Sequence, residues 1–167
     1  YTSKGYYLNL SYELAKPEFL SSDSNGYKID FYRLVSRNRF YIPFDDTFGL
    51  ALSYTFGLQE NLAGNTGFIP SIKVFRLTGI DTVRGFSEEE INRDSGGVDV
   101  SSHFIQSRVF MSNIKVEPRY RWRDDMIFAV FWDAGRVQRD SYDTTDLRSS
   151  MGVSFKYVTP VGTLDFD

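Results

Sequence analysis

The chain has 167 residues, a net charge of −3 and a sequence pI of about 5.2. This acidic balance argues against a generic nucleic-acid partner. The absence of cysteine excludes disulfides, thiolate metal sites and a cysteine nucleophile, and a single histidine, His103, argues against a multi-histidine metal site. The mean hydropathy is −0.33 while 17% of the residues are aromatic, a combination that argues against a helical membrane protein but is compatible with a membrane β-barrel.

Apolar and polar residues alternate in the first third of the chain, as they do in strands with two different faces. Residues 6–14 carry tyrosine and leucine at the even positions, and residues 48–58 repeat this pattern. Between them, residues 27–44 begin with apolar residues at odd positions and end with apolar residues at even positions. We explain this change of frame by a β-bulge near residues 33–37.

The remaining sequence predicts strands over residues 110–122, 126–137 and 147–157, and the start of another over 163–167. The odd face of residues 110–122 carries Lys115, Glu117, Arg119 and Arg121, which suits a wet lumen because charges are costly to bury. The opposite faces are apolar and suit lipid. Aromatic residues near the ends of the predicted strands resemble the girdles of membrane barrels: Tyr12, Phe40, Phe56, Tyr120, Trp122 and Tyr157.

The connections between these strands alternate in length, from long (17–26) to short (43–47), long (61–104), short (122–126), medium (138–146) and short (159–162). Such alternation is typical of an up-and-down transmembrane barrel whose two rims face different compartments. Six strands and the start of a seventh are fewer than bacterial barrels use. We therefore expect an all-β, antiparallel transmembrane β-barrel, with residues 1–167 forming one part of it.

The long connection over residues 61–104 contains enough apolar residues to pack against another surface: Ile72, Val74, Phe75, Leu77, Ile80, Val83, Phe86 and Ile91. Within it, Gly85 permits a tight turn that presents Arg84. If the loop folds into the lumen, Arg84 could form a bidentate pair with Asp133 or Glu117. The residues alone leave open whether Arg84 forms this pair or is a solvated loop charge.

Four short motifs in this order resemble one known family. Val83, Arg84, Gly85 and Phe86 resemble its VRGF/Y loop signature, and residues 131–135 (FWDAG) resemble its FxDxG strand motif. Residues 157–164 resemble its TPxGxL hairpin, and residues 39–43 resemble its RYYxPL strand end. The chain therefore resembles the BamA/TamA-type family of outer-membrane assembly and translocation barrels, also called the bacterial surface antigen family.

This resemblance implies roughly the ninth to fifteenth strands of a barrel of about 16 strands in the bacterial outer membrane. Residues 61–104 would be an extracellular loop folded into the lumen. Arg84 would contact a lumen wall formed by Asp133, Glu117, Phe131 and Gly135. The periplasmic POTRA domains of the family, and any gate between first and last strands, would lie outside this chain.

The resemblance implies a non-enzymatic barrel, without cofactor or metal, that helps outer-membrane proteins fold and insert. Its partners would be the lipid bilayer, unfolded outer-membrane client proteins and accessory subunits bound through the POTRA domains. A two-partner-secretion transporter and a barrel fused to a patatin-like hydrolase remain open alternatives. So do a soluble β-sandwich and a porin-like passive channel, whose basic lumen residues would either favour anions or pair with nearby acids: Lys115, Arg119, Arg121, Arg148 and Lys156.

Overall fold

The computed structural model describes residues 4–16, 28–78, 82–93, 108–140 and 147–166; Ile80, His103 and Asp167 lie outside them. The described residues form one antiparallel sheet in which each strand pairs with the next in the chain. This confirms the predicted all-β, up-and-down architecture. The strands are β1 (Gly5–Ala15), β2 (Phe31–Pro43), β3 (Phe48–Asn61), β4 (Arg108–Arg123), β5 (Met126–Arg139), β6 (Arg148–Thr159) and β7 (Gly162–Phe166).

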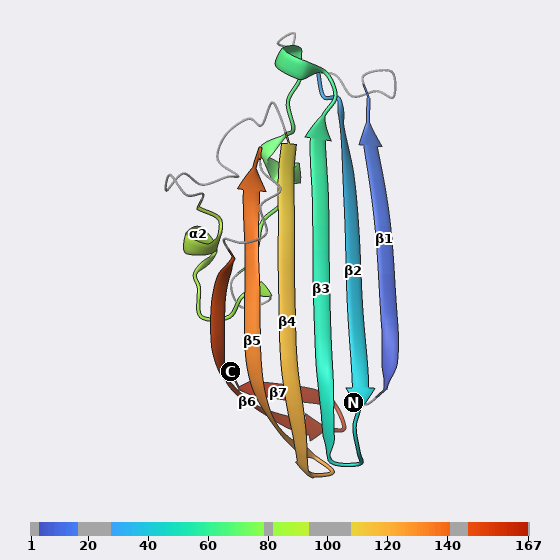
Figure 1. The fold of residues 1–167 in the computed structure, drawn as a ribbon, viewed down its shortest axis with the longest axis vertical. Helices are drawn as coiled ribbons and strands as arrows, with labels where there is room; N and C mark the ends of the chain where they lie inside the picture. The colour runs from blue at the N-terminus through green and yellow to red at the C-terminus, as the bar shows by residue number, and fades with distance from the viewer. Residues whose placement is uncertain (1–3, 17–27, 79–81, 94–107, 141–146, 167) are drawn as a thin grey trace.

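The sheet is curved, and the connections are sorted by length between its two ends. In Figure 1 the short turns β2–β3, β4–β5 and β6–β7 lie at the lower end, while β1 ends and β2 begins at the upper end. β6 bends so that its second half and β7 run across the lower ends of the other strands. Among the described residues, no helix combines the length and apolar character needed to cross a bilayer.

The predicted β-bulge near residues 33–37 is wrong. β2 pairs with β1 and with β3 in an unbroken register through Arg33, Val35 and Arg37. The frame changes because Phe31 and Val35, on the odd face, are buried in an apolar cluster against the long loop. The odd-numbered face of β2 therefore changes from apolar at Phe31 and Val35 to charged at Arg37, without the inserted residue that a β-bulge requires. A register shift occurs instead between Arg121 and Arg123, beside the β4–β5 turn.

The two faces of the sheet differ in chemistry as the alternation predicts. Along β5, Phe128, Val130 and Trp132 are exposed while Ile127, Ala129 and Phe131 between them are buried. Exposed apolar side chains continue on β1 and β6: Leu8, Leu10, Tyr12, Met151 and Val153. An exposed apolar band on the outside of a curved sheet is what a lipid-facing barrel wall requires.

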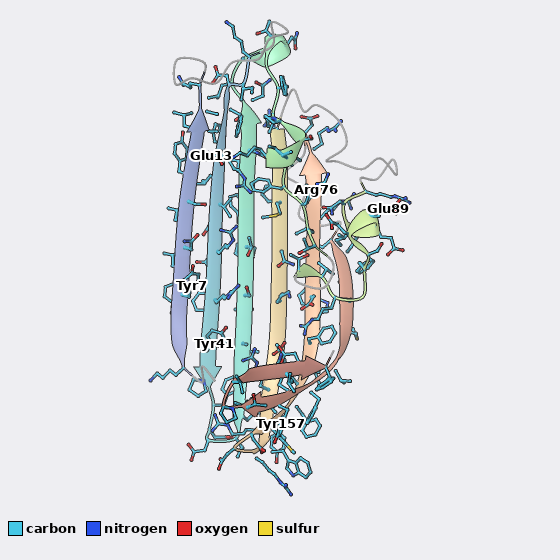
Figure 2. All side chains as sticks on the ribbon, turned by 180° about the vertical axis from the view of Figure 1, so that it is seen from behind. Tyr7, Glu13, Tyr41, Arg76, Glu89 and Tyr157 are labelled. Atoms are coloured by element: carbon cyan, nitrogen blue, oxygen red, sulfur yellow. The ribbon has the colours of Figure 1, made fainter. Side chains whose placement is uncertain are left out.

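The loop between β3 and β4 folds back over the concave face of the sheet (Figure 2). It contains the short helices η2 (Gly64–Thr66), η3 (Ser71–Lys73) and α2 (Glu88–Ile91). A capping box formed by Ser87 and Glu90 starts α2. The loop and the upper part of the wall share one apolar cluster, whose buried members are Phe31, Val35, Ile69, Val74, Phe75, Leu77, Val83, Ile91, Val109, Met111 and Val137.

Most apolar loop residues are placed as the sequence predicts, with one exception among those described. Val74, Phe75, Leu77, Val83 and Ile91 are buried and Phe86 packs against their cluster. Ile72 is 89% exposed, so its predicted packing is wrong. It lies in the single turn η3, and a helix with three residues per turn presents only one side to the wall.

Candidate functional site

The turn at Arg84 and Gly85 lies against the concave face of the sheet. Gly85 has φ of +82°, a conformation that favours glycine. Just before the turn, the Asn113 side-chain amide on β4 donates to the Thr82 carbonyl at 2.9 Å and to the Ala134 carbonyl at 3.1 Å. Val83 is completely buried. These contacts fix the backbone on which Arg84 is presented.

Arg84 and Asp133 form a bidentate ion pair. Arg84 Nε donates to Asp133 Oδ2 at 2.7 Å, and Nη2 donates to Oδ1 at 3.0 Å. The backbone N–H of Arg84 also donates to Oδ2 at 3.2 Å. Asp133 is fully buried and Arg84 is 7% exposed. The fork of the guanidinium matches both carboxylate oxygens, which is the geometry that favours arginine over lysine.

Glu117 on β4 joins this pair to two further cations. Its Oε2 accepts from Arg84 Nη2 at 3.3 Å, while its Oε1 lies 2.6 Å from Arg119 Nε and 3.6 Å from Lys156 Nζ. Lys156 also lies 3.3 Å from Asp165 on β7. Three cations thus compensate two buried carboxylates, and the charges connect the loop to four neighbouring strands. Each buried charge has a partner, as burial requires.

The ring of Phe131, on β5 of the wall, lies against the Arg84 guanidinium. The Arg84 guanidinium carbon is 3.5 Å from the centre of its ring, a close cation–π contact. A side chain at Gly152 on β6 would overlap this ring, since a Cβ there would lie 2.6 Å from Phe131 Cζ. The predicted wall residue Phe131 therefore packs against Arg84. Its ring occupies space beside Gly152 that any larger residue at that position would fill.

Gly135 makes room for the loop on β5. A Cβ there would lie 2.9 Å from Val83 and 3.2 Å from Leu77. Phe86, after the turn, packs against the apolar cluster. All eight residues singled out in the sequence thus lie in one region, and Arg84 contacts Asp133, Glu117 and Phe131 directly.

A second set of loop contacts was not anticipated. Phe75 lies on Gly57 of β3, where a Cβ would be 2.7 Å from the ring, and the Arg33 guanidinium carbon is 4.7 Å from the ring centre. The Gln59 amide donates to the Lys73 carbonyl at 2.8 Å. Lys73 Nζ lies 2.6 Å from Glu13 Oε1 on β1. The signal in the sequence is the small residue Gly57 in an otherwise regular strand.

Buried amide side chains hold the loop backbone. Asn92 accepts from the Leu77 N–H at 2.8 Å and donates to the Leu77 carbonyl at 2.7 Å. These two bonds connect the part of the loop before the Arg84 turn to the part after it. Asn61 donates to the carbonyls of Gly64 and Gly67. These bonds satisfy backbone groups that the irregular loop cannot pair by itself. Nothing in the strand alternation marks these amides.

The arrangement is suited to holding a loop. Within the described ranges, no group of three or more histidine, aspartate or glutamate side chains is placed to hold a metal ion. Removing one partner of a buried charge pair costs about 3–5 kcal/mol. The ion pair, the apolar cluster and the amide bonds together therefore fix the loop on the concave face.

Comparisons with known proteins identify the family and the fold. A family model described as the Omp85 superfamily domain matches residues 2–167. A crystal structure of BamA from Haemophilus ducreyi lacking POTRA domains 1–3 matches with a TM-score of 0.66 at 16% identity.

That match covers 98% of this chain and 34% of the BamA chain, so this chain spans about a third of its length. No curated protein matches. The family match and the fold indicate the bacterial outer membrane as the location. The chain, over nearly its whole length, belongs to the Omp85 superfamily.

Proposed function

We propose that this chain is part of the wall of an outer-membrane barrel that helps β-barrel proteins fold and insert into the membrane. The observation that carries the proposal is the buried cluster of Arg84, Asp133 and Glu117, which holds the long loop on the concave face. The likeness to a BamA barrel supports the same activity. This function needs binding and shape alone, without a cofactor or a covalent step.

The partners that we propose follow from the two faces of the wall. The exposed apolar band contacts the lipid bilayer. Unfolded outer-membrane proteins are the proposed clients, and accessory subunits would bind through POTRA domains elsewhere in the protein. The proposed role of Arg84 is to keep the loop in one position, so that the barrel keeps the shape that clients require.

The activity is tested with the full-length protein reconstituted in liposomes, together with an unfolded outer-membrane client. The wild type is expected to accelerate the appearance of folded, heat-modifiable client. Arg84→Ala is expected to lose most of this acceleration, because the loop is released. Arg93→Ala is the matched control, since Arg93 lies in the same loop and its side chain forms an ion pair with exposed Glu89.

The competing functions give different outcomes in the same liposomes. A two-partner-secretion transporter would move its substrate into the liposome lumen without inserting it in the bilayer. A passive channel would show a large, steady conductance that Arg84→Ala leaves unchanged. An assembly barrel whose loop occupies the concave face is expected to show low conductance that rises in Arg84→Ala. Acceleration that is equal in Arg84→Ala and in the wild type would contradict the proposed role of the cluster.

A further inference from the structure

The concave face has a strongly basic region, and the ion pairs that anchor the loop use only part of its positive charge. A cavity of about 910 Å³ lies there, lined by Arg33, Arg37 and Arg39 of β2 and by Lys115 and Arg119 of β4. Among the described residues that line it, eight side chains are basic and two are acidic. Since the whole chain carries a net charge of −3, positive charge is concentrated at this cavity.

The acids near this cavity are already engaged by other cations. Asp133 and Glu117 bind Arg84, Glu117 also binds Arg119, and Asp165 pairs with Lys156. In contrast, no carboxylate of the described residues forms an ion pair with Arg37 or Arg39. Within the described part of the chain, the Arg37 side chain donates to the amide oxygen of Asn9 at 3.5 Å and forms no ion pair.

The strand register places these cations in a regular array. Arg37 and Arg39 are exposed on the same face of β2, and residues two apart on a strand are about 6.6–6.8 Å apart. Arg39 pairs with Ser53, which in turn pairs with Lys115, so Lys115 lies about 10 Å from Arg39 across the sheet. Alternate side chains of an extended peptide have the same spacing as Arg37 and Arg39.

Two tyrosines flank this array, Tyr7 on β1 and Tyr41 on β2. Tyr7 pairs with Arg39, and a smaller cavity of about 330 Å³ is lined by Tyr7, Arg37, Arg39 and Tyr41. Their hydroxyl groups can donate to carboxylates, and their rings can pack against peptide side chains. We define the basic strip as Tyr7, Arg37, Arg39, Tyr41 and Lys115.

We propose that the basic strip binds an acidic stretch of extended polypeptide inside the barrel. Carboxylates two residues apart would face Arg37 and Arg39, with charge-assisted hydrogen bonds to the two guanidinium groups. An anionic lipid fits less well because the strip lies on the polar, concave side while the exposed apolar band lies on the other face. The inference rests on the concave face being the lumen, and not on the assembly activity proposed above.

The probe is a fluorescein-labelled peptide of about twelve residues that alternates glutamate and serine. Binding to the full-length protein in nanodiscs of zwitterionic lipid is measured by fluorescence anisotropy. We expect saturable binding that weakens when salt rises from about 0.05 to 0.5 M, and no binding of the matched peptide with lysine in place of glutamate. Arg37→Gln with Arg39→Gln is expected to weaken binding by at least about ten-fold.

The matched control is Arg93→Gln with Arg123→Gln, which changes the net charge equally but lies away from the strip. This control is expected to bind the acidic peptide as the wild type does. If the double variant of the strip fails to fold, as judged by heat-modifiability, Arg39→Gln alone is expected to give a smaller loss in the same direction. Arg37→Lys with Arg39→Lys keeps the charge and is expected to bind within a few-fold of the wild type.

Three outcomes would overturn the inference. The first is the absence of saturable binding of the acidic peptide to the wild type. The second is an equal loss in the control variant, which would show that only net charge matters. The third is displacement of the peptide by short-chain phosphatidylglycerol at a concentration that leaves the bilayer intact, which would identify the strip as a site for anionic headgroups.

Discussion

Arg84 is held by several contacts of different kinds, and this determines how the site responds to mutation. Its guanidinium pairs with Asp133, approaches Glu117 and lies over Phe131. Asp133 accepts three hydrogen bonds from Arg84 alone. Deleting either partner leaves a buried charge without compensation, so the two residues act as one unit.

We predict that Arg84→Ala and Asp133→Ala are non-additive. Each single variant is expected to lower the stability of the docked loop by about 3–5 kcal/mol. The double variant is expected to cost little more than either single one, because no unpaired charge remains. Protection of residues 61–104 from protease, measured on the full-length protein in detergent, gives the three values. Additive losses would show that the two residues do not interact.

Gly57 is a second residue at which a small change has a large expected effect. Its added Cβ in Gly57→Ala would meet the ring of Phe75 at 2.7 Å, so the loop must shift. We expect a loss of about 1–3 kcal/mol in loop stability, read by the same protease assay. In a Phe75→Leu background the substitution is expected to be nearly neutral.

Ser53→Ala, on the same strand and in the lining of the cavity, is the control for Gly57→Ala and is expected to behave as the wild type. A loss in Gly57→Ala that persists in the Phe75→Leu background would show that the ring does not cause it.

Among the elements, the sequence predicts strands better than it predicts loop contacts. The alternation places all seven strands within a few residues, since one face meets lipid and the other water. It fails at Phe31 and Val35, where the lumen face is apolar because a loop covers it. The motifs single out Arg84 and Asp133, and the alternation places Glu117 on the lumen face. In contrast, Gln59, Asn92 and Asn113 bind the loop backbone and show no periodic signal.

The short β2–β3 turn provides a prediction about pH. The hydroxyl and N–H of Thr47 and the N–H of Phe48 all donate to Asp45, and these bonds lower the pKa of its carboxyl below the ordinary aspartate value of 3.8. A lowered folded pKa means that the stabilisation is present above the unfolded pKa and is lost as pH falls through the folded pKa. The turn should therefore loosen only as the pH falls below the ordinary pKa of aspartate.

This expectation is measured through the NMR amide shifts of Thr47 and Phe48 between pH 2 and 6 in detergent. The wild type should titrate with a midpoint below 3.8, and Asp45→Asn should remove the titration. Asp46→Asn serves as the control in the same turn and should leave the midpoint unchanged. A midpoint at or above that of a free aspartate would contradict the capping role of Asp45.

For the whole molecule, the assignment of the two faces predicts opposite tolerance to charge. Val130 is 55% exposed on the apolar face of β5, where arginine would be in lipid. We expect Val130→Arg to cost about 2–4 kcal/mol and to reduce the fraction of folded, heat-modifiable protein. Ser53→Arg, in the lining of the cavity on the concave face, is expected to fold like the wild type. Equal folding of both variants would contradict the orientation of the sheet.

The position of Arg84 in the chain has a consequence for the order of folding. Its two acidic partners come 33 and 49 residues later, on strands that must pair before either carboxylate is in place. The loop is therefore synthesised before β4 and β5 but docks only after they have paired, because its long-range contacts form with residues on those strands. Docking of Arg84 is thus a marker of the folding stage at which β4 and β5 have already paired in the sheet.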